Sequence, residues 1–561
     1  MEAQIRSHCY NTSYDPEKGS WSALELGIEN YGPHREIGRK LYGPDCAEKQ
    51  KKSSSRRRYI AQIVASFGVT WIVLNAIIAR YSAPLSQAGS ISPQASNWKS
   101  AFLSIWAQGN HDLTLHPLSS RATAIKDRCQ SLPPFPDDVY RTRIKRVQDQ
   151  LQRIHEERAT GTDSTKTSAG EIYVLEPSAS SMYYTGIGSK EWHASERPFL
   201  FLIEFQKGER LGESTTILSI LTPAFEASRA KLLNFPGMDK STEVEFIEWK
   251  EEEDWAQVFV QHLEQQKDPT VQGQATFNLH FDPAVRSFIP AAIAHALAKQ
   301  GLQPDSDFSM DVADPRILSV RERKSVEEIA VLKCANELTL EAIRATKDTM
   351  FFGIKESQTA NVLSRYFEEL GMPGGEGLVL FGGEGFPLTE NAALPHGTGS
   401  DRALRKEDFA LIDAGGQFRG YTSDITRTFA LSGSKISATQ DRLWNLVKEA
   451  QTAALRAGVV GATGQEVDAA AREIIEAKGK RQAEREGFTH RLGHGIGLEG
   501  HESPYLVGSN ARSIEKGNVF SDEPGIYIPG EIGVRLEDCW YVNAEGQGEL
   551  LTEQAKDFWT L

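Results

Sequence analysis

The stretch "LIDAGGQFRGYTSDITRTF", Leu411–Phe429, decides how the second half of this chain is interpreted. Two aspartates, Asp413 and Asp424, stand eleven positions apart in it, and three glycines lie between them. A surface turn contains the same residue types, because Asp and Gly both favour turns. The stretch alone therefore leaves two interpretations open, a charged hairpin and one wall of a metal site.

More acids and histidines follow beside glycines further along the chain. His494 lies in "HRLGHGIGLEGHE", with His490 four positions before it and His501 seven after it, while Glu523 lies in "FSDEPG" and Glu537 in "GVRLED". Carboxylate and imidazole donors suit Mn, Co, Zn or Fe(II) ions. Four carboxylates and one imidazole carry too much negative charge for one divalent ion. We therefore expect two ions with shared carboxylates, an arrangement that can activate water at neutral pH.

Each of these residues also has an explanation without chemistry. Glu537 alone is typical of a solvated acid at a strand end, and His494 alone is typical of a core or surface histidine. The segment "GIGLEG" fits the G-x-G-x-x-G spacing, but it does not open a βαβ unit, so a dinucleotide site is not favoured. No G-x-S-x-G motif is present, so a serine hydrolase has no support.

Taken together and in order, four segments resemble one known family. "LIDAGGQFRGYTSDITRTF", "HRLGHGIGLEGHESPYL", "EPGIYIPG" and "GVRLED" resemble peptidase family M24, the creatinase/aminopeptidase or pita-bread fold, in its branch of Xaa-Pro dipeptidases (prolidases) and aminopeptidase P. "SMYYTGIG" and "RKSVEEIAVLKCA" resemble the N-terminal domain and interdomain helix of that family. The resemblance covers roughly Tyr140 to Val542 and is most specific in the C-terminal half. It implies an α+β fold, with a pita-bread domain after a smaller α/β creatinase-type domain.

The resemblance assigns roles to the five matching ligand positions. Asp413 would bind one ion, and His494 with Glu523 would bind the other. Asp424 and Glu537 would bridge both. The complete set disfavours the metal-free branch of the fold. The implied cofactor is two divalent ions, Mn(II) in first place, with Co(II), Zn(II) or Fe(II) as alternatives.

Further positions match residues that contact substrate or support the ligands in the family: His396, His490, His501 and Arg535. Thr426 stands where a hydroxyl supports the bridging aspartate. In the implied mechanism, Glu523 takes a proton from the attacking water and returns it to the leaving group, while His501 stabilises the oxyanion. Two residues depart from the pattern. Asp522 is an additional acid, expected to point away because strand neighbours face opposite sides, and Cys539 is unexpected beside the site.

The implied activity is hydrolysis of the Xaa-Pro bond of a dipeptide, or of the N-terminal Xaa-Pro bond of a peptide. These motifs do not separate a dipeptidase from an aminopeptidase P, and they leave a homodimer open. One alternative is a hydrolase or C–N cleaving enzyme of the same fold that acts on a specialised small molecule. Another is a non-catalytic binding protein, which the intact ligand set argues against.

Composition narrows the class of protein. The chain has 561 residues, of which 40% are hydrophobic and 25% charged. This length exceeds one ordinary core, so two or three domains are expected. The net charge of -14 argues against a nucleic-acid partner. The five cysteines are widely spaced, and we expect neither a metal-ligand pair nor a disulfide framework among them.

One segment is apolar enough to cross a membrane. Residues 59–79 carry no charge over 21 positions and follow the basic run "KKSSSRRR", and about 20 apolar residues span a bilayer. The positive-inside rule predicts a single-pass anchor with a disordered cytosolic tail, 1–58, and a linker, 80–115, on the other side. The alternative is a buried helix of a soluble domain, which would imply a cytoplasmic location.

In the rest of the chain, the pattern of apolar and polar residues indicates two globular domains, 120–315 and 320–545. In the first, apolar spacing predicts a helix over 137–159 and another over 290–301, with strand-like runs between them. The second should begin with one long amphipathic helix after a hinge near Leu318. Short strands and two helices, 438–458 and 463–479, follow in a mixture typical of an α+β domain.

Overall fold

The computed structural model describes residues 13–15, 20–22, 113–160, 167–206, 217–265, 275–302, 308–383 and 391–561. The chain divides into two compact units, Met1–His111 and Asp112–Leu561. In the first unit the described residues form one antiparallel pair, β1 (Ser13–Asp15) and β2 (Ser20–Ser22). The other residues of the predicted tail, 1–58, lie outside the described residues.

The predicted anchor, 59–79, lies outside the described residues, as does most of the predicted linker. Among the helices that the structure does describe, none combines the length and the apolar character that a membrane crossing needs.

The N-terminal part of the second unit is a six-stranded mixed sheet in the order β6-β5-β4-β3-β7-β8. Its strands are β3 (Thr167–Leu175), β4 (Leu200–Gln206), β5 (Leu218–Pro223), β6 (Val244–Trp249), β7 (Ala275–Phe281) and β8 (Phe308–Val312). β3 pairs antiparallel with β4 and parallel with β7. The predicted strands of this region are therefore present, in one sheet.

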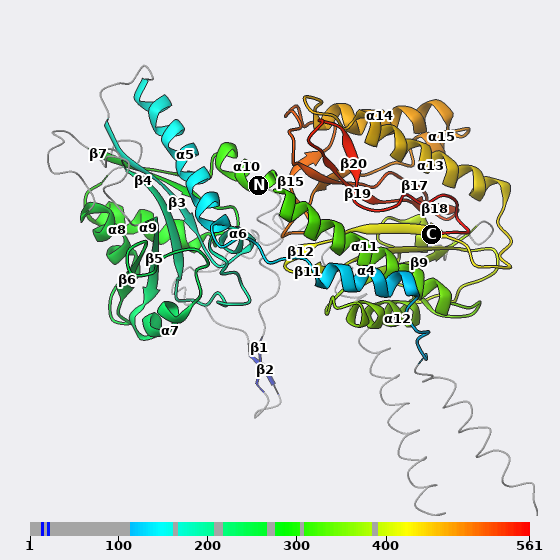
Figure 1. Cartoon of the computed structure of the whole chain (residues 1–561), viewed down its shortest axis with the longest axis horizontal. Helices are drawn as coiled ribbons and strands as arrows, with labels where there is room; N and C mark the ends of the chain where they lie inside the picture. Colours follow the sequence, from blue (N-terminus) through cyan, green and yellow to red (C-terminus); the bar gives the residue numbers. More distant parts are fainter. Residues whose placement is uncertain are drawn as a thin grey trace, which may run out of the picture. The chain divides into compact units, whose positions relative to one another are not determined.

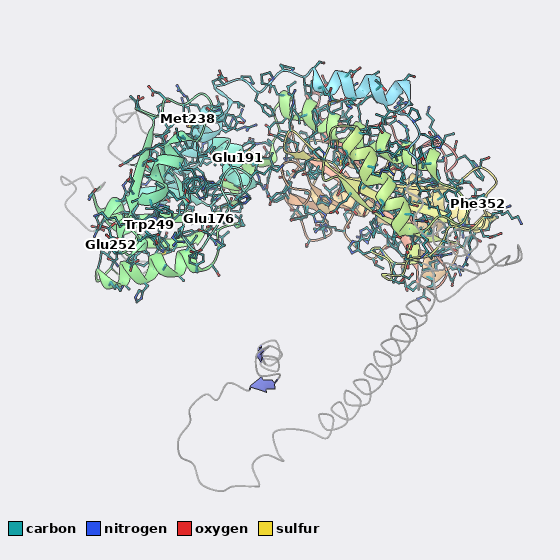
Figure 2. The ribbon with its side chains drawn as sticks, turned by 90° about the horizontal axis from the view of Figure 1, so that it is seen from below. Glu176, Glu191, Met238, Trp249, Glu252 and Phe352 are labelled. Atoms are coloured by element: carbon teal, nitrogen blue, oxygen red, sulfur yellow. A yellow bond between two sulfur atoms is a disulfide. The ribbon has the colours of Figure 1, made fainter. Side chains whose placement is uncertain are left out.

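Helices pack on both faces of this sheet (Figure 1). They are α5 (Val139–Thr160), α6 (Ala179–Thr185), α7 (Ala227–Leu232, after the short η2, Ala224–Glu226), α8 (Trp255–Gln265) and α9 (Phe288–Lys299). Tyr173 of β3 packs in the cluster with α5 and α6, and its neighbour Val174 packs in the cluster with α8 and α9. This follows because successive side chains of a strand face opposite sides. Trp249, at the end of β6, belongs to the second cluster (Figure 2).

The C-terminal part is built from antiparallel sheets, β13-β10-β9 and β15-β14-β16-β19-β20, with the pairs β11-β12 and β17-β18. The strands are β9 (Glu376–Gly382), β10 (Phe409–Gly415), β11 (Gln417–Phe418), β12 (Tyr421–Thr422), β13 (Ile425–Phe429), β14 (Gly493–Gly495), β15 (Glu502–Leu506), β16 (Val519–Asp522), β17 (Gly525–Ile528), β18 (Ile532–Arg535), β19 (Asp538–Val542) and β20 (Gly548–Leu550).

Helices line these sheets in two groups (Figure 1). The elements are α11 (Val326–Thr349), α12 (Glu356–Glu369), η3 (Asn391–Ala393), α13 (Ala438–Ala457), α14 (Gly464–Lys478) and α15 (Gln482–Arg485). α10 (Pro315–Glu322) precedes them, and its Ile317 and Val320 pack in the cluster with α5 and α6. α11 and α12 share a hydrophobic cluster with β9 and β10, whereas α13 and α14 share one with β16 to β19. The α+β class predicted for this region is therefore observed.

The single long helix predicted to open this domain is wrong, because α10 and α11 are separate helices. Arg323 between them is extended, with φ −97° and ψ 108°. The Lys324 N–H donates to the Gly517 carbonyl at 2.8 Å. Ser325 then caps α11 in a reciprocal capping box with Glu328. A backbone pairing to a distant segment thus interrupts a sequence that has continuous helical character.

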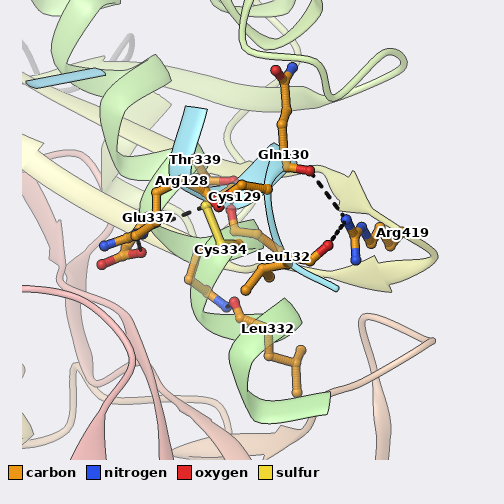
Figure 3. The surroundings of a disulfide bond; sticks show 12 residues. Arg128, Cys129, Gln130, Leu132, Leu332, Cys334, Glu337, Thr339 and Arg419 are labelled. Atoms are coloured by element: carbon orange, nitrogen blue, oxygen red, sulfur yellow. Dashed lines mark hydrogen bonds and ion pairs between the residues drawn. A yellow bond between two sulfur atoms is a disulfide. The ribbon is translucent and has the colours of Figure 1, made fainter. Parts of the chain in front are cut away.

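The sequence predicts no disulfide framework, and the described residues contain one disulfide. Cys129 of α4 (Ser120–Gln130) is bonded to Cys334 of α11 across 205 sequence positions (Figure 3). α4 falls within the range 120–315 predicted for the first domain, but it packs against α11. Spacing rules recognise cysteines that lie close in sequence, whereas this pair is joined by tertiary packing.

Two of the predicted ligands, Glu523 and Glu537, lie at breaks between strands. Glu523 lies between β16 and β17, and Glu537 lies between β18 and β19. Pro524 has no N–H for a ladder, which favours the first break. At the breaks the Glu523 N–H donates to the Leu492 carbonyl at 2.9 Å, and the Glu537 N–H donates to the Thr426 carbonyl at 3.0 Å. Both acids are therefore held by neighbouring backbone.

Candidate metal centre

Asp413 and Asp424 are delivered by one strand–turn–strand segment. β10 carries Asp413, which lies opposite Thr426 of β13, and Asp424 immediately precedes β13. The short pair β11-β12 closes the turn between them. One carboxylate oxygen from each of Asp413, Asp424 and Glu537 lies within 4.8 Å of the others. The opening stretch is therefore a hairpin whose two acids converge on a third.

A second group of ligand atoms shares Glu537. One atom each from His494, Glu523 and Glu537 also lies within 4.8 Å of the others. His494 Nε2 is 3.6 Å from Asp424 Oδ2 and 3.5 Å from Glu523 Oε1. Because the two groups share Glu537, all five side chains predicted as ligands gather in one place.

The backbone around His494 fixes how its ring is presented. His494 Nδ1 lies 3.0 Å from the Gly495 carbonyl oxygen, which can only accept, so Nδ1 carries the proton and Nε2 keeps its lone pair. The His494 N–H donates to Ser521 Oγ at 3.1 Å. A Cβ at Gly493 would lie 2.1 Å from the Ser521 carbonyl oxygen, so this approach requires glycine. The histidine thus offers a free imidazole nitrogen to the four acids.

A buried network connects Arg535 to two of the acids. Arg535 Nη2 donates to Asp413 Oδ2 at 2.6 Å, and its Nε donates to Thr426 Oγ1 at 3.0 Å. The Thr426 hydroxyl in turn donates to Glu537 Oε2 at 2.7 Å. The expected support of Asp424 by Thr426 is therefore corrected: the hydroxyl serves Glu537, whose backbone N–H also bonds to Thr426.

Three outer histidines lie at different distances from the acids. His501 is exposed, and one of its ring nitrogens belongs with Asp424 and His494 to a group of atoms within 4.8 Å of one another. His490 Nε2 is 3.2 Å from the Tyr527 hydroxyl. His396 is exposed in the loop after η3, and the preceding carbonyl, of Pro395, accepts from Arg535 Nη1 at 3.1 Å. Only His501 of these three joins a ligand group in the described part of the chain.

A cavity of about 420 Å³ opens beside His501. Tyr173, Tyr184 and Asp282 of the six-stranded sheet domain line it, and Glu502 lines it from the C-terminal part. His501 thus lies with Asp424 and His494 on one side and, on the other, beside a space large enough for a side chain or a short peptide segment.

Comparisons with known proteins agree with this geometry. The sequence profile of metallopeptidase family M24 matches residues 330–544. An uncharacterized peptidase of Schizosaccharomyces pombe is 38% identical over 373 residues, covering 66% of this chain and 75% of that relative. The chain belongs to metallopeptidase family M24.

Solved structures extend the likeness of this M24 peptidase beyond the profile. A prolidase from Thermococcus sibiricus is similar with a TM-score of 0.58 and 26% identity, covering 75% of this chain and 99% of that one. An X-Pro aminopeptidase from Thermotoga maritima MSB8 is similar with a TM-score of 0.53 and 25% identity, covering 70% of this chain and 98% of that one. The predicted pita-bread fold and the predicted metallo-exopeptidase class are confirmed.

The charges in the M24 peptidase fit a pair of cations. Burial, with the charges of Asp413 and Glu523, raises the pKa of Asp424 well above its usual range. Burial also raises the pKa of Glu537 well above its usual range, and that of Glu523 to about 7. Burial lowers the pKa of His494 to about 3, which keeps the imidazole neutral. Crowded carboxylates and a neutral imidazole suit divalent ions, and members of family M24 are dinuclear metal enzymes.

Two residues of the M24 peptidase that contact this network were not predicted. The Tyr527 hydroxyl accepts from Arg535 Nη1 at 2.8 Å and reaches His490. Asn336 of α11 accepts the Asp424 N–H at its Oδ1, at 3.3 Å. Tyr527 lies inside the motif "EPGIYIPG", so a polar aromatic there was an available signal. Asn336 is a buried amide on the apolar side of an amphipathic helix, which was the signal for it.

The two departures from the family pattern have different surroundings. Asp522 is fully buried on β16 opposite Asp538, and neither carboxyl oxygen has a hydrogen-bond partner in the described part of the chain. It belongs to none of the ligand groups, in line with the expectation that it points away. Cys539 is buried, and its thiol donates to the Asp424 carbonyl at 3.3 Å. The cysteine therefore supports the backbone of a predicted ligand.

Proposed function

We propose that this M24 peptidase hydrolyses the Xaa-Pro bond of dipeptides, or the N-terminal Xaa-Pro bond of peptides, with two divalent ions. The observation that carries the proposal is the convergence of all five predicted ligands, with His501 beside them. The names of the similar structures, a prolidase and an X-Pro aminopeptidase, support the choice of bond. Asp413, Asp424, His494, Glu523 and Glu537 would hold the ions.

The chain's own residues would move the protons. The bound ions would supply Lewis-acid activation of a water molecule and of the peptide carbonyl. Glu523 would take the proton of the attacking water and return it to the imino leaving group. His501, on the open side of His494, would stabilise the developing oxyanion. His490 and Arg535, joined through Tyr527, would keep their positions around the acids.

Proline after the scissile bond needs no acceptor from the enzyme, because a tertiary amide has no N–H. A site that offers no hydrogen-bond acceptor at that point therefore loses no binding energy with proline. With any other residue there, the N–H of the scissile peptide bond would be left without a partner. The cavity beside His501 gives room for residues beyond the scissile bond. Peptides longer than two residues are for this reason included among the proposed substrates.

The identity of the ions and the location of the chain are further parts of the proposal. Oxygen-rich ligands with one imidazole favour Mn(II), with Co(II), Zn(II) or Fe(II) as alternatives.

For the location, we propose that residues 59–79 anchor the chain in a membrane and that residues 1–58 lie in the cytosol. The Cys129–Cys334 bond supports an oxidising environment for the enzyme domain. Release into the soluble fraction by carbonate at high pH would contradict the anchor. A homodimer stays a prediction, which sedimentation can test.

The decisive experiment compares substrates on the purified full chain. After removal of metal by a chelator, Mn(II) or Co(II) is added, and Ala-Pro, Ala-Pro-Ala and Ala-Ala-Ala are offered. We expect hydrolysis of one or both proline peptides, slow cleavage of Ala-Ala-Ala, and no turnover before metal is restored. No cleavage of either proline peptide with metal bound would refute the proposed substrate class. Cleavage of the tripeptide alone would identify an aminopeptidase.

A further inference from the structure

A segment before the six-stranded sheet lies along the C-terminal part and is covalently attached to it. This segment, residues 113–135, is called the arm. At its start the Leu113 carbonyl accepts from Arg365 Nη1 at 2.6 Å, and the His116 N–H donates to the Tyr366 hydroxyl at 2.9 Å. Its helix α4 runs beside α11, and the Cys129–Cys334 bond joins the two (Figure 3).

Apart from the disulfide, α4 is held mainly at its surface. Only Ala122 and Cys129 of its eleven residues are buried. Its ion pairs involve partly exposed arginines: Arg128 pairs with Glu337, and Arg121 pairs with Glu341 and Glu553. Exposed ion pairs contribute about 0–1 kcal/mol each. Several apolar side chains of the arm pack partly buried against the α11 cluster. The covalent bond is therefore the strongest single attachment of α4.

The end of the arm holds the tip of the hairpin that carries two predicted ligands. Arg419 lies in the β11-β12 turn, between Asp413 and Asp424, with a φ of 48°. Its Nη1 donates to the Pro133 carbonyl at 2.8 Å, and its Nη2 donates to the Leu132 carbonyl at 2.6 Å (Figure 3 labels Leu132 and Arg419). These acceptors follow Cys129 within four positions.

α11 holds the base of the same hairpin. Asn336, two positions after Cys334, accepts the Asp424 N–H. The hydroxyls of Thr339 and Ser423 are 2.6 Å apart, and the Gly416 N–H donates to Ser423 Oγ at 3.0 Å. α11 also reaches the tip, where the Tyr421 hydroxyl donates to Glu328 Oε1 at 2.8 Å. The hairpin is thus held by both the arm and α11, and the disulfide joins these two supports.

We infer that Cys129–Cys334 is a positioning disulfide for the metal centre, whose oxidation state sets the affinity of the Asp413–Asp424 hairpin for metal. With the bond intact, the two supports of the hairpin keep one spacing. Reduction removes the covalent link between the arm and α11, so the arm holds Arg419 less firmly and the two carboxylates are less well preorganised. The inference deepens the proposed function and rests on its metal centre.

The redox step is a thiol–disulfide exchange. A dithiol attacks one sulfur of Cys129–Cys334, the sulfur–sulfur bond breaks, and a mixed disulfide forms. The first attack releases one protein thiol. The second thiol of the reagent then attacks the mixed disulfide and releases the other protein thiol. The protein gains two electrons and two protons, and the reagent leaves as its own disulfide. Both cysteines are buried, so we expect reduction to be slow without prior opening of the arm.

The test measures metal binding to the metal-free full chain by calorimetry. Mn(II) is the probe, because reduced Cys129 and Cys334 lie with Glu337 in a group that could bind a softer ion. Peptide mapping first verifies the bond in the oxidised sample. We expect dithiol treatment, or Cys129→Ser with Cys334→Ser, to weaken Mn(II) binding about five- to tenfold, as for one or two lost hydrogen bonds. The double variant should no longer respond to the dithiol.

Arg419→Ala supplies the coupling test, with Arg153→Ala on the exposed side of α5 as the matched control. Arg419→Ala should weaken Mn(II) binding in the oxidised protein and have little effect in the double cysteine variant, because the two changes disrupt the same support of the hairpin. Equal affinity before and after reduction, or independent additive effects of the two changes, would overturn the inference. Those results leave the peptidase proposal standing, whereas absence of Mn(II) binding in both states overturns both.

Discussion

Arg535 and Asp413 form a partly buried ion pair in which Arg535 Nη2 is 2.6 Å from Asp413 Oδ2. The same guanidinium donates to Thr426 and to Tyr527. One side chain therefore contacts the predicted ligand Asp413, the hydroxyl of Thr426 that donates to Glu537, and the hydroxyl of Tyr527 that lies beside His490. The planar fork of arginine makes these three contacts at once, which the single ammonium of lysine cannot reproduce.

Arg535→Lys is therefore expected to lose activity although it keeps the charge. The Asp413 carboxylate would retain a cation nearby, but Thr426 and Tyr527 would lose a donor. Loss of a group that orients metal ligands typically costs about 10- to 100-fold in metal affinity or activity. Mn(II) titration and Xaa-Pro hydrolysis measure the two effects. Wild-type values for both in Arg535→Lys would show that the fork is not required.

Glu523→Gln separates proton transfer from metal binding. The amide keeps one oxygen donor but cannot accept the proton of the attacking water. We expect turnover to fall by a factor of about 100 or more, the low end for a lost general base, while metal remains partly bound. Asp522→Asn is the matched control, because the pKa of Asp522 is raised well above its usual range by burial and a neutral amide has similar shape. Similar losses in both variants would contradict the role of Glu523.

The metal-free protein should become less stable as pH rises from about 6.5 to 8. Burial raises the pKa of Glu523 to about 7 and raises those of Asp424 and Glu537 well above their usual range. The folded state then binds more protons than the unfolded state, so stability present at low pH is lost as pH rises through about 7. Below about pH 6.5 the lowered pKa values of His490 and His494 act in the opposite direction.

Thermal unfolding at four pH values between 6.5 and 8, with chelator or with Mn(II), measures this dependence. With chelator the melting temperature should fall across the range. With Mn(II) the fall should disappear, because bound cations favour the ionised carboxylates. A melting temperature that rises with pH in chelator would show that the acids are not crowded as the structure places them.

The sequence was informative where chemistry and local pattern coincide. Asp413, His494 and Glu523 stand beside glycines or proline at strand ends, and the family resemblance ordered them into one site. The sequence was uninformative where contacts between distant segments determine the structure. The break before α11 depends on Lys324 pairing with Gly517, and the Cys129–Cys334 bond depends on the packing of α4. Such contacts have no spacing signature, since residues about 200 positions apart meet only after folding.

The same limit applies inside the site. The five predicted ligands converge, but Thr426 was assigned to Asp424 rather than to Glu537. The hydroxyl lies on β13 and the glutamate lies between β18 and β19, strands of different sheets that meet only after folding. A resemblance transfers residue identities more reliably than it transfers hydrogen-bond partners.

Lys324 should be important for stability through a buried ion pair next to the cavity. Its ammonium donates to Glu502 Oε1, and both side chains are almost fully buried. Arg321 Nη2 lies 3.6 Å from the other Glu502 oxygen, which compensates only part of the charge. Lys324→Met would leave Glu502 short of a partner, and breaking a buried pair costs about 3–5 kcal/mol. We expect a lower melting temperature, with most of the loss recovered by adding Glu502→Gln. If the double variant is no more stable than Lys324→Met alone, the lysine acts by packing rather than by charge.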